Sequence, residues 1–186
     1  MPVPEDLLRK CLAYFLKHGV ANLSLRPLAA AIGTSARMLV HHFGSKEQLI
    51  AAVMDRTRSR LQASFESAVR AQSQTDCAEV MLGFWRLTTS RKYRPYLKLL
   101  FEVQILAIQN PTRYAQYLSD TSASWVRLIE RTLPSGARRQ VTATLATAVL
   151  DGLMLEYLST GDLRRTSQAV KHFLELLMQP KSGKKR

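Results

Sequence analysis

Apolar residues recur at intervals of three and four positions along most of the chain, which is the spacing of one face of an α-helix. No stretch shows the every-second-residue alternation of a half-buried strand, and no internal repeat is visible. Glycine, proline and polar clusters divide the pattern into short helices up to about residue 45 and longer helices after it. We therefore predict an all-α fold of about nine helices.

The first predicted helix lies near the N-terminus. Pro4, Glu5 and Asp6 suit its start, because acidic side chains favour the positive end of a helix, and Gly19 marks its end. Its apolar stripe consists of Leu8, Cys11, Leu12 and Phe15. With the two short helices that follow, it makes a predicted three-helix unit.

Residues 24–46 contain two short helical patterns that share one glycine-marked turn. The first pattern begins at Ser24, whose hydroxyl can cap free backbone N–H groups, and it tolerates Pro27 within the first turn. Gly33 ends it, because the position after a helix often needs a positive φ. Its apolar positions are Leu25, Leu28, Ala29 and Ile32. Such a pair predicts a helix-turn-helix, which lays its second helix in the major groove of DNA.

The second short helix divides into an inward and an outward face. Ser35 can cap it, while Leu39 and Phe43, four positions apart, can hold it against the core. The residues that point away are Ala36, Arg37, Val40 and His41. We predict that this outward face contacts DNA, with Arg37 able to donate two hydrogen bonds to guanine.

A third helix start follows at once. Gly44 closes the preceding helix, and Ser45 with Gln48 forms the pattern of a capping box. Lys46 then lies in the first turn, where a DNA phosphate can dock. We expect Arg26, His41 and Lys46 to hold the DNA backbone and fix the register. The candidate DNA-binding residues are Arg26, Ser35, Ala36, Arg37, Val40, His41 and Lys46.

The remaining chain predicts longer helices. One runs from about Lys46 to a polar break near residues 72–75, and the next spans about 76–90. Further helices are expected at about 95–109, from Asn110 and Pro111 to about 133, from after Gly136 to Gly161, and at about 165–178. The segment 143–158 is apolar nearly all round, so that helix must pack on more than one side.

Charge favours a polyanionic partner. The formal net charge is +13, from 27 Lys and Arg against 14 Asp and Glu. Residues 1–70 carry ten basic against five acidic residues, and residues 71–186 carry seventeen against nine, so the excess is spread over the chain. An exposed basic tail contains Lys181, Lys184, Lys185 and Arg186, and a second basic run contains Arg86, Arg91, Lys92, Arg94 and Lys98. We interpret the tail as a disordered end. The internal run is either a solvated surface or a site for an acidic group.

Several classes of function find no support. No apolar run approaches the 18 or so residues that span a bilayer, and the N-terminus lacks a signal-peptide core, so we expect a cytoplasmic protein without a membrane partner. Cys11 and Cys77 are isolated and lack the spacing of metal ligands. His41 and His42 are adjacent and point about 100° apart on a helix, so they cannot chelate one ion. No catalytic motif is present, and we expect no catalytic residues, metal or cofactor.

The helix-turn-helix segment resembles the TetR family of bacterial transcriptional regulators. The residues that carry the resemblance are Phe15, Gly19, Leu28, Ala29, Gly33, Ser35, Leu39, His41, His42, Phe43, Ser45 and Lys46. It implies a DNA-binding domain over residues 1–50, joined by a long helix to a helical ligand-binding and dimerisation domain over 51–180, with a basic tail at 181–186. The chain departs from the family at Val40, where a tyrosine that contacts DNA is usual. Val40 offers only apolar contact, for instance to a thymine methyl group.

The resemblance also implies a homodimer on a palindromic operator, because the last two long helices of the family commonly pair with those of a second subunit. Two recognition helices about 34 Å apart can contact both halves of such a site. The candidate dimerisation residues are Leu145, Val149, Leu153, Tyr157, Phe173 and Leu177. A purely intramolecular core is the alternative.

A small apolar or amphipathic effector is expected in the middle of the chain, where eight of the fourteen aromatic residues lie between Phe84 and Trp125. The candidate ligand-binding residues are Trp85, Tyr96, Phe101, Glu102, Gln104, Tyr114, Tyr117 and Trp125. Glu102 interrupts an apolar run, where it either receives a cationic ligand group or pairs with Lys98 one turn earlier.

Together these features predict a ligand-responsive DNA-binding regulator, most simply a repressor that its effector releases from DNA. One alternative is a DNA-binding protein without a ligand, whose aromatic cluster would be close-packed. A second is a small helical enzyme, whose site would gather polar groups around Glu102 and the tyrosines.

Overall fold

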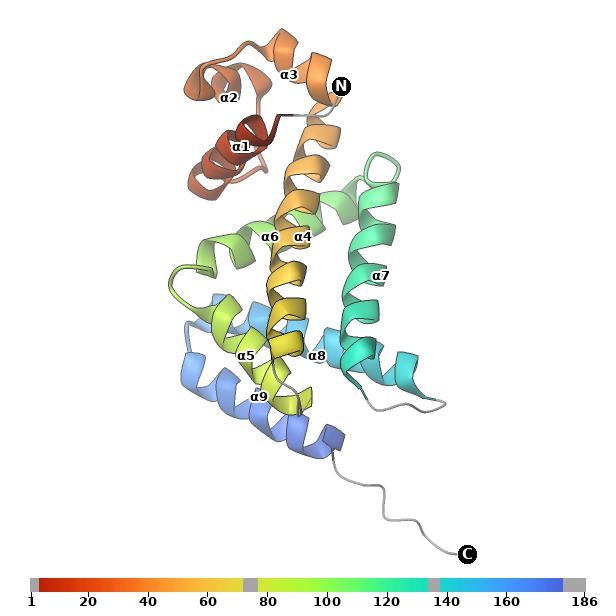
Figure 1. Cartoon of the computed structure of the whole chain (residues 1–186). Helices are drawn as coiled ribbons and strands as arrows, with labels where there is room; N and C mark the ends of the chain where they lie inside the picture. The colour runs from red at the N-terminus through yellow and green to blue at the C-terminus, as the bar shows by residue number, and fades with distance from the viewer. Residues whose placement is uncertain (1–3, 72–76, 134–137, 179–186) are drawn as a thin grey trace, which may run out of the picture.

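The computed structural model describes residues 4–71, 77–133 and 138–178, and within these ranges the chain forms nine helices and no strand (Figure 1). The helices are α1 (Glu5–His18), α2 (Leu25–Ile32), α3 (Ala36–Phe43), α4 (Lys46–Ala71), α5 (Cys77–Thr89), α6 (Arg94–Gln109), α7 (Ala115–Thr132), α8 (Arg139–Thr160) and α9 (Leu163–Met178). The all-α prediction is confirmed. The expected basic tail lies outside the described residues.

The turn between α2 and α3 has the predicted glycine geometry. Gly33 adopts φ 74° and ψ 40°, and the N–H of Thr34 donates to the carbonyl of Ala29 at 2.9 Å, which ends α2 with a turn that a side chain would strain. The hydroxyl of Ser35 accepts from the N–H of Met38 at 3.2 Å, as expected of an N-cap. Ser24 occupies the N-cap of α2, but its side chain makes no capping hydrogen bond, so that detail of the prediction was wrong.

α4 connects the two ends of the molecule as one continuous helix of 26 residues (Figure 1). Its start is capped by Ser45, whose hydroxyl accepts from the N–H of Gln48 at 3.1 Å. Farther along, the Arg56 guanidinium pairs with Glu5 of α1 at 3.0 Å, and Arg60 pairs with the same carboxylate. Helix α1 is therefore fixed against α4 by charge as well as by packing.

The core beneath the N-terminal helices is not confined to residues 1–50. Cys11, Phe15, Leu28 and Leu39 pack in one cluster with residues of later helices. These contributions come from α6, through Leu99, Val103 and Ala107, and from Tyr114 and Tyr117 around the start of α7. A boundary near residue 50 thus follows the chain but cuts through a continuous apolar core.

A second core joins α5, α8 and α9. The indole N–H of Trp85 donates to the hydroxyl of Ser167 at 2.9 Å, which ties α5 to α9. The hydroxyl of Tyr157 donates to the carbonyl of Thr89 at 3.1 Å, which ties α8 to the end of α5. Both aromatic rings are buried, so their polar atoms need these partners.

Two local features differ from or sharpen the sequence prediction. α7 begins at Ala115 rather than at Asn110, because residues 111–113 form a turn and the Asn110 amide instead donates to the carbonyl of Leu106 at 2.9 Å.

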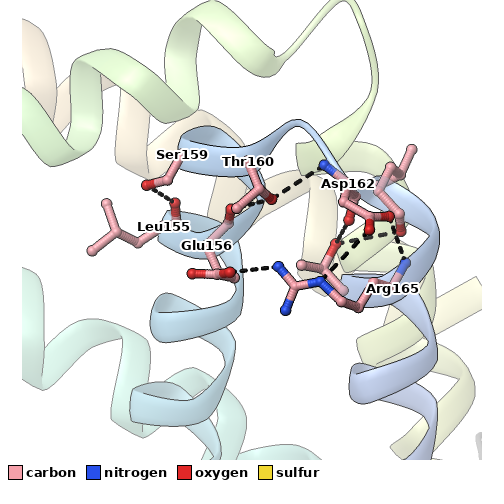
Figure 2. Close-up of polar contacts among 8 residues, drawn as sticks. Leu155, Glu156, Ser159, Thr160, Asp162 and Arg165 are labelled. Atoms are coloured by element: carbon pink, nitrogen blue, oxygen red, sulfur yellow. Dashed lines mark hydrogen bonds and ion pairs between the residues drawn. The ribbon is translucent and has the colours of Figure 1, made fainter.

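At the junction between α8 and α9, Asp162 caps α9 by accepting from the N–H of Arg165 at 2.9 Å, and the Arg165 guanidinium pairs with Glu156 of α8 (Figure 2). The ion pair links the last two helices where they meet.

α8 is long and apolar enough to cross a membrane by length and composition alone, so the expectation that no segment approaches this size does not hold for it. Core helices of soluble proteins pass the same test. Its apolar character is explained by packing on one side, because Ala146 and Leu150, four positions apart, lie on the same face and in the core. On the opposite side apolar residues remain exposed.

Candidate DNA-binding surface and ligand cavity

α3 presents the outward face that its sequence predicts. Leu39 and Phe43 are buried and hold the helix against the core, whereas Arg37 and His41 are exposed. The apolar side chains of Met38 and Val40 are 43% and 45% exposed. This face combines one long hydrogen-bond donor with apolar groups, a set suited to base edges and thymine methyl groups.

Cationic groups flank that face. Arg26 is exposed in the first turn of α2, and Lys46 is half-buried at the start of α4, shortly after α3 ends. Ser35 is exposed, although its hydroxyl is engaged in capping α3, and Ala36 is half-buried. Nothing in the structure tests contact with DNA, and the assignment of these seven residues stays a prediction.

A cavity of about 60 Å³, partly open to solvent, lies between α4, α5, α6, α7 and α8. Aromatic and aliphatic side chains make most of its wall. The lining residues are Met54, Thr57, Arg58, Leu61, Phe84, Thr88, Tyr93, Tyr96, Leu97, Leu100, Trp125, Ile129, Thr147, Leu150, Asp151 and Met154. Such a wall, apolar with few polar groups, is typical of small-molecule sites.

Asp151 is the carboxylate of this cavity wall. Desolvation by the surrounding side chains raises the pKa of its carboxyl to about 6, although the residue as a whole is exposed to solvent. It makes no hydrogen bond or ion pair within the described part of the chain. Arg58 is the cation of the same wall, and it is already paired with Asp55 and donates to the Ser124 hydroxyl at 3.1 Å.

The predicted ligand-binding residues are dispersed by the fold. Tyr96 and Trp125 line the cavity, whereas Trp85, Tyr114 and Tyr117 are buried in the two cores. Phe101 and Glu102 lie in a separate outer cleft, and Gln104 lines neither space. For those six residues the placement differs from the prediction, because aromatic spacing along a sequence does not distinguish a core from a cavity wall.

Phe84, Tyr93 and Asp151 were missed as cavity residues. The two aromatics belong to the same aromatic-rich segment, but only packing brings them onto the cavity wall. Asp151 could have been recognised in the sequence, because it interrupts the apolar segment 143–158 just as Glu102 interrupts an apolar run.

Glu102 has a role that neither sequence alternative anticipated. Its Oε1 atom accepts from the backbone N–H of Val20 at 2.7 Å and from that of Ala21 at 2.8 Å. These donors lie directly after Gly19, whose φ of 72° turns the chain out of α1. A carboxylate on α6 therefore holds the α1–α2 connection, and it neither lines the cavity nor pairs with Lys98 in the described structure.

The outer cleft beside this contact has a volume of about 1060 Å³ and separates α1 from α6 and α8. Part of the predicted basic run, Arg91, Arg94 and Lys98, lies along it. All three residues are exposed. A separate ion pair joins Arg113, which follows α6, to Glu47 in the first turn of α4 at 3.1 Å.

The exposed side of α8 carries a continuous apolar stripe at heptad spacing. It consists of Val141, Leu145, Ala148, Gly152 and Leu155, and we call these five residues the α8 stripe. Leu145 is 55% exposed, and Leu176 of α9 is 53% exposed. Of the other candidate dimerisation residues, Val149, Leu153, Phe173 and Leu177 are half-buried. Tyr157 is buried within its own chain and bonded to Thr89, which does not favour its assignment to a dimer interface.

The two cysteines are placed as small apolar residues. Cys11 and Cys77 are both buried, and burial raises the pKa of the Cys11 thiol to about 11. Because the thiolate is the reactive form, Cys11 is chemically quiet at neutral pH.

Comparison with known proteins finds a family match over the N-terminal helices. Residues 7–53 match the family "Bacterial regulatory proteins, tetR family". The HTH-type transcriptional regulatory protein RaaS of Mycobacterium tuberculosis is 38% identical over 61 residues, which is 33% of this chain and 28% of that protein. The HTH-type transcriptional repressor AcnR of Corynebacterium glutamicum is 27% identical over 166 residues, covering 84% of this chain and 82% of AcnR. The chain thus spans less than a third of RaaS but most of AcnR.

Solved structures share the whole fold. A transcriptional regulator from Rhodococcus sp. Rha1 superposes with a TM-score of 0.79 at 18% identity, covering 95% of this chain and 96% of that one. The multidrug binding protein EbrR, in complex with ethidium, superposes with a TM-score of 0.74 at 18% identity, covering 95% and 98% of the two chains. These similarities extend the likeness from the DNA-binding region to the helical body.

Proposed function

We propose that this chain, which belongs to the TetR family of transcriptional regulators, is a repressor that binds a palindromic operator as a homodimer and is released by a small-molecule effector. The observation that carries the proposal is the pairing of two features in one fold. An exposed α3 with its apolar and cationic face lies at one end of α4, and a cavity lies beside the same helix farther along.

The DNA half of the proposal rests on α3. Arg37 would contact guanine, while Met38 and Val40 would meet thymine methyl groups in the major groove. Arg26, His41 and Lys46 would hold phosphates on either side. With one long polar side chain on this face, sequence preference would depend partly on DNA shape.

The response to an effector rests on the links between α6 and the DNA-binding helices. Helix α6 supplies Leu97 and Leu100 to the cavity wall, and two residues later Glu102 holds the α1–α2 connection. A ligand that displaces α6 would therefore also move Glu102 and the α1–α2 connection that it holds. Such a ligand shifts the equilibrium only if it binds the DNA-free arrangement more tightly.

The cavity also supports a second candidate function, which is a DNA-binding regulator without a small-molecule ligand. Its volume of about 60 Å³ is smaller than the roughly 150 Å³ of an apolar cavity known to take up benzene. An effector would therefore have to enlarge it. Met54 and Met154 in the wall can adapt their shape, which favours the ligand-responsive alternative.

Selection of bound fragments from random DNA with the purified chain tests the first half directly. We expect enrichment of a palindrome whose half-sites lie about one helical turn apart. Enrichment of no sequence, or of a site without two-fold symmetry, would contradict the proposed operator. Release of the selected fragment by a small-molecule library would then separate the two candidate functions.

A further inference from the structure

We infer that the effector of this protein is an organic cation, an amine attached to an aromatic or apolar body, and that Asp151 is the residue that recognises its charge. This inference rests on the proposed function, because it names the ligand class of the cavity described above.

The three threonine hydroxyls of the wall are occupied within their own helices. The hydroxyl of Thr57 donates to the carbonyl of Val53 at 2.8 Å, that of Thr88 to Phe84 at 2.9 Å, and that of Thr147 to Ala143 at 2.9 Å. These threonines are therefore satisfied without a ligand.

Charge in the cavity is unbalanced in one direction. The Arg58 guanidinium pairs with the Asp55 carboxylate, so one cation and one anion compensate each other. Asp151 has no such partner in the described structure. Although Asp151 is exposed as a residue, the wall partly desolvates its carboxylate, and a bound cation would offset the cost of that desolvation.

The neighbouring wall suits the body of such a ligand. Phe84 and Trp125 lie with ring centroids 5.3 Å apart, and Tyr93 and Tyr96 lie 5.6 Å apart. All four rings line the cavity that Asp151 reaches. Aromatic faces attract a cation through their quadrupole and pack against an apolar group, so they add to the pull of the carboxylate.

Two other occupants compete with this assignment. An anionic ligand would use Arg58, whose Nε atom is buried and without a hydrogen-bond acceptor. Alternatively, Asp151 would pair with a basic residue of a second subunit, because it adjoins Gly152 of the α8 stripe. Each alternative makes a different prediction in one experiment.

The experiment measures binding of three probes of matched shape to the full chain by isothermal titration calorimetry at pH 7.5. The probes are 2-phenylethylamine, which is a cation, 2-phenylethanol, which is neutral, and phenylacetate, which is an anion. We expect the amine to bind about tenfold or more tightly than the alcohol. In Asp151→Asn this preference should disappear. The control variant Glu79→Gln, which removes an exposed carboxylate away from the cavity, should retain it. The alcohol reports whether the cavity of each variant is intact.

Several results would overturn the inference. These are equal binding of amine and alcohol, tighter binding of phenylacetate, no binding of any probe, or a preference for the amine that persists in Asp151→Asn. A shift of the monomer–dimer equilibrium in Asp151→Asn, with the preference unchanged, would assign the carboxylate to the subunit interface instead.

A parallel DNA-release assay keeps the two proposals distinguishable. Amine binding that depends on Asp151 without release of the selected operator would support the cation site and contradict the ligand-responsive repressor. Release of the operator by the alcohol or by phenylacetate, but not by the amine, would support the repressor and contradict the cation site.

Discussion

The carboxylate of Glu102 accepts the backbone N–H of Val20 at 2.7 Å, although the two residues are 82 positions apart in the sequence. The same oxygen accepts from Ala21 at 2.8 Å. An ionised acceptor with two backbone donors forms stronger hydrogen bonds than a neutral one. This contact joins α6, which also lines the cavity, to the connection between α1 and α2.

Removing that acceptor should lower stability. In Glu102→Ala two N–H groups lose their partner, one of them partly buried, so we expect the free energy of unfolding to fall by about 1–3 kcal/mol in urea titrations. Glu102→Gln keeps an acceptor oxygen and should lose less. Glu79→Ala removes an exposed carboxylate on α5 and should change stability by less than about 0.5 kcal/mol. Equal effects of the two alanine variants would contradict the role given to Glu102.

The adjacent glycine gives a second test of the same contact. A Cβ atom at position 19 would lie 2.8 Å from Oε1 of Glu102, and the backbone there has a φ of 72° that side chains rarely adopt. Gly19→Ala should therefore destabilise the protein by about 1 kcal/mol or more. Glu102→Ala removes the clash. We therefore expect the free energy of unfolding to fall in the double variant by at least about 0.5 kcal/mol less than the sum of the two single losses. Additive losses would show that only backbone strain matters.

Replacing Arg37 and Lys46 by alanine should change DNA binding in different ways. Arg37→Ala should weaken operator binding by about 1–3 kcal/mol and relax the preference at the base pair it contacts. Lys46→Ala should weaken binding to all sequences and reduce the slope of affinity against salt by about one. Fluorescence anisotropy with the selected operator and a scrambled fragment, at several salt concentrations, measures both. Unchanged affinity and preference in Arg37→Ala would mean that the face assigned to DNA is wrong.

A charge on the α8 stripe should prevent dimerisation. In Leu145→Glu a carboxylate would be buried between subunits without a partner, so sedimentation should show a monomer at concentrations where the unaltered chain is a dimer. Ile108→Glu is the matched control, since Ile108 of α6 is also a large exposed residue, at 56%, and lies off the stripe. Dimers that form equally well in both variants would place the interface elsewhere.

Asp151 should make stability fall as pH rises. The folded chain raises the pKa of this carboxyl from 3.8 to about 6, so the folded state holds its proton more tightly than the unfolded state. The resulting cost is absent below about pH 4, grows between about pH 4 and 6, and is complete above that range. Asp151→Asn should thus raise the melting temperature at pH 7.5 and leave it nearly unchanged at pH 4. For Glu79→Gln the difference from the unaltered chain should be independent of pH across this interval.

Local signals in the sequence were sufficient for most helix ends. Gly19, Gly33, Gly44 and Gly161 all have positive φ, and each directly follows a helix that the pattern ends there. The face of α3 was also predictable, because burial of Leu39 and Phe43 four positions apart determines which side chains point outward.

The ligand side could not be obtained in the same way. Tyr117 and Trp125 both lie on α7. Tyr117 belongs to the core beneath the N-terminal helices, with Phe15 and Leu39, whereas Trp125 lines the cavity. Which of these surroundings a ring meets depends on the neighbouring helices, and helical periodicity holds no information about them. Glu102 shows the same limit, since its partners are main-chain groups of a distant turn.

The shared core beneath α1, α2 and α3 also determines what can be exchanged between related regulators. A chimera that joins residues 1–50 to a foreign body would expose the apolar surface that Leu99, Val103 and Ala107 cover, and it would leave the α1–α2 turn without its acceptor. Transfer of the DNA specificity of this protein would require the matching side of α6 as well. The unit that is portable between proteins is therefore larger than the helix-turn-helix and discontinuous in the sequence.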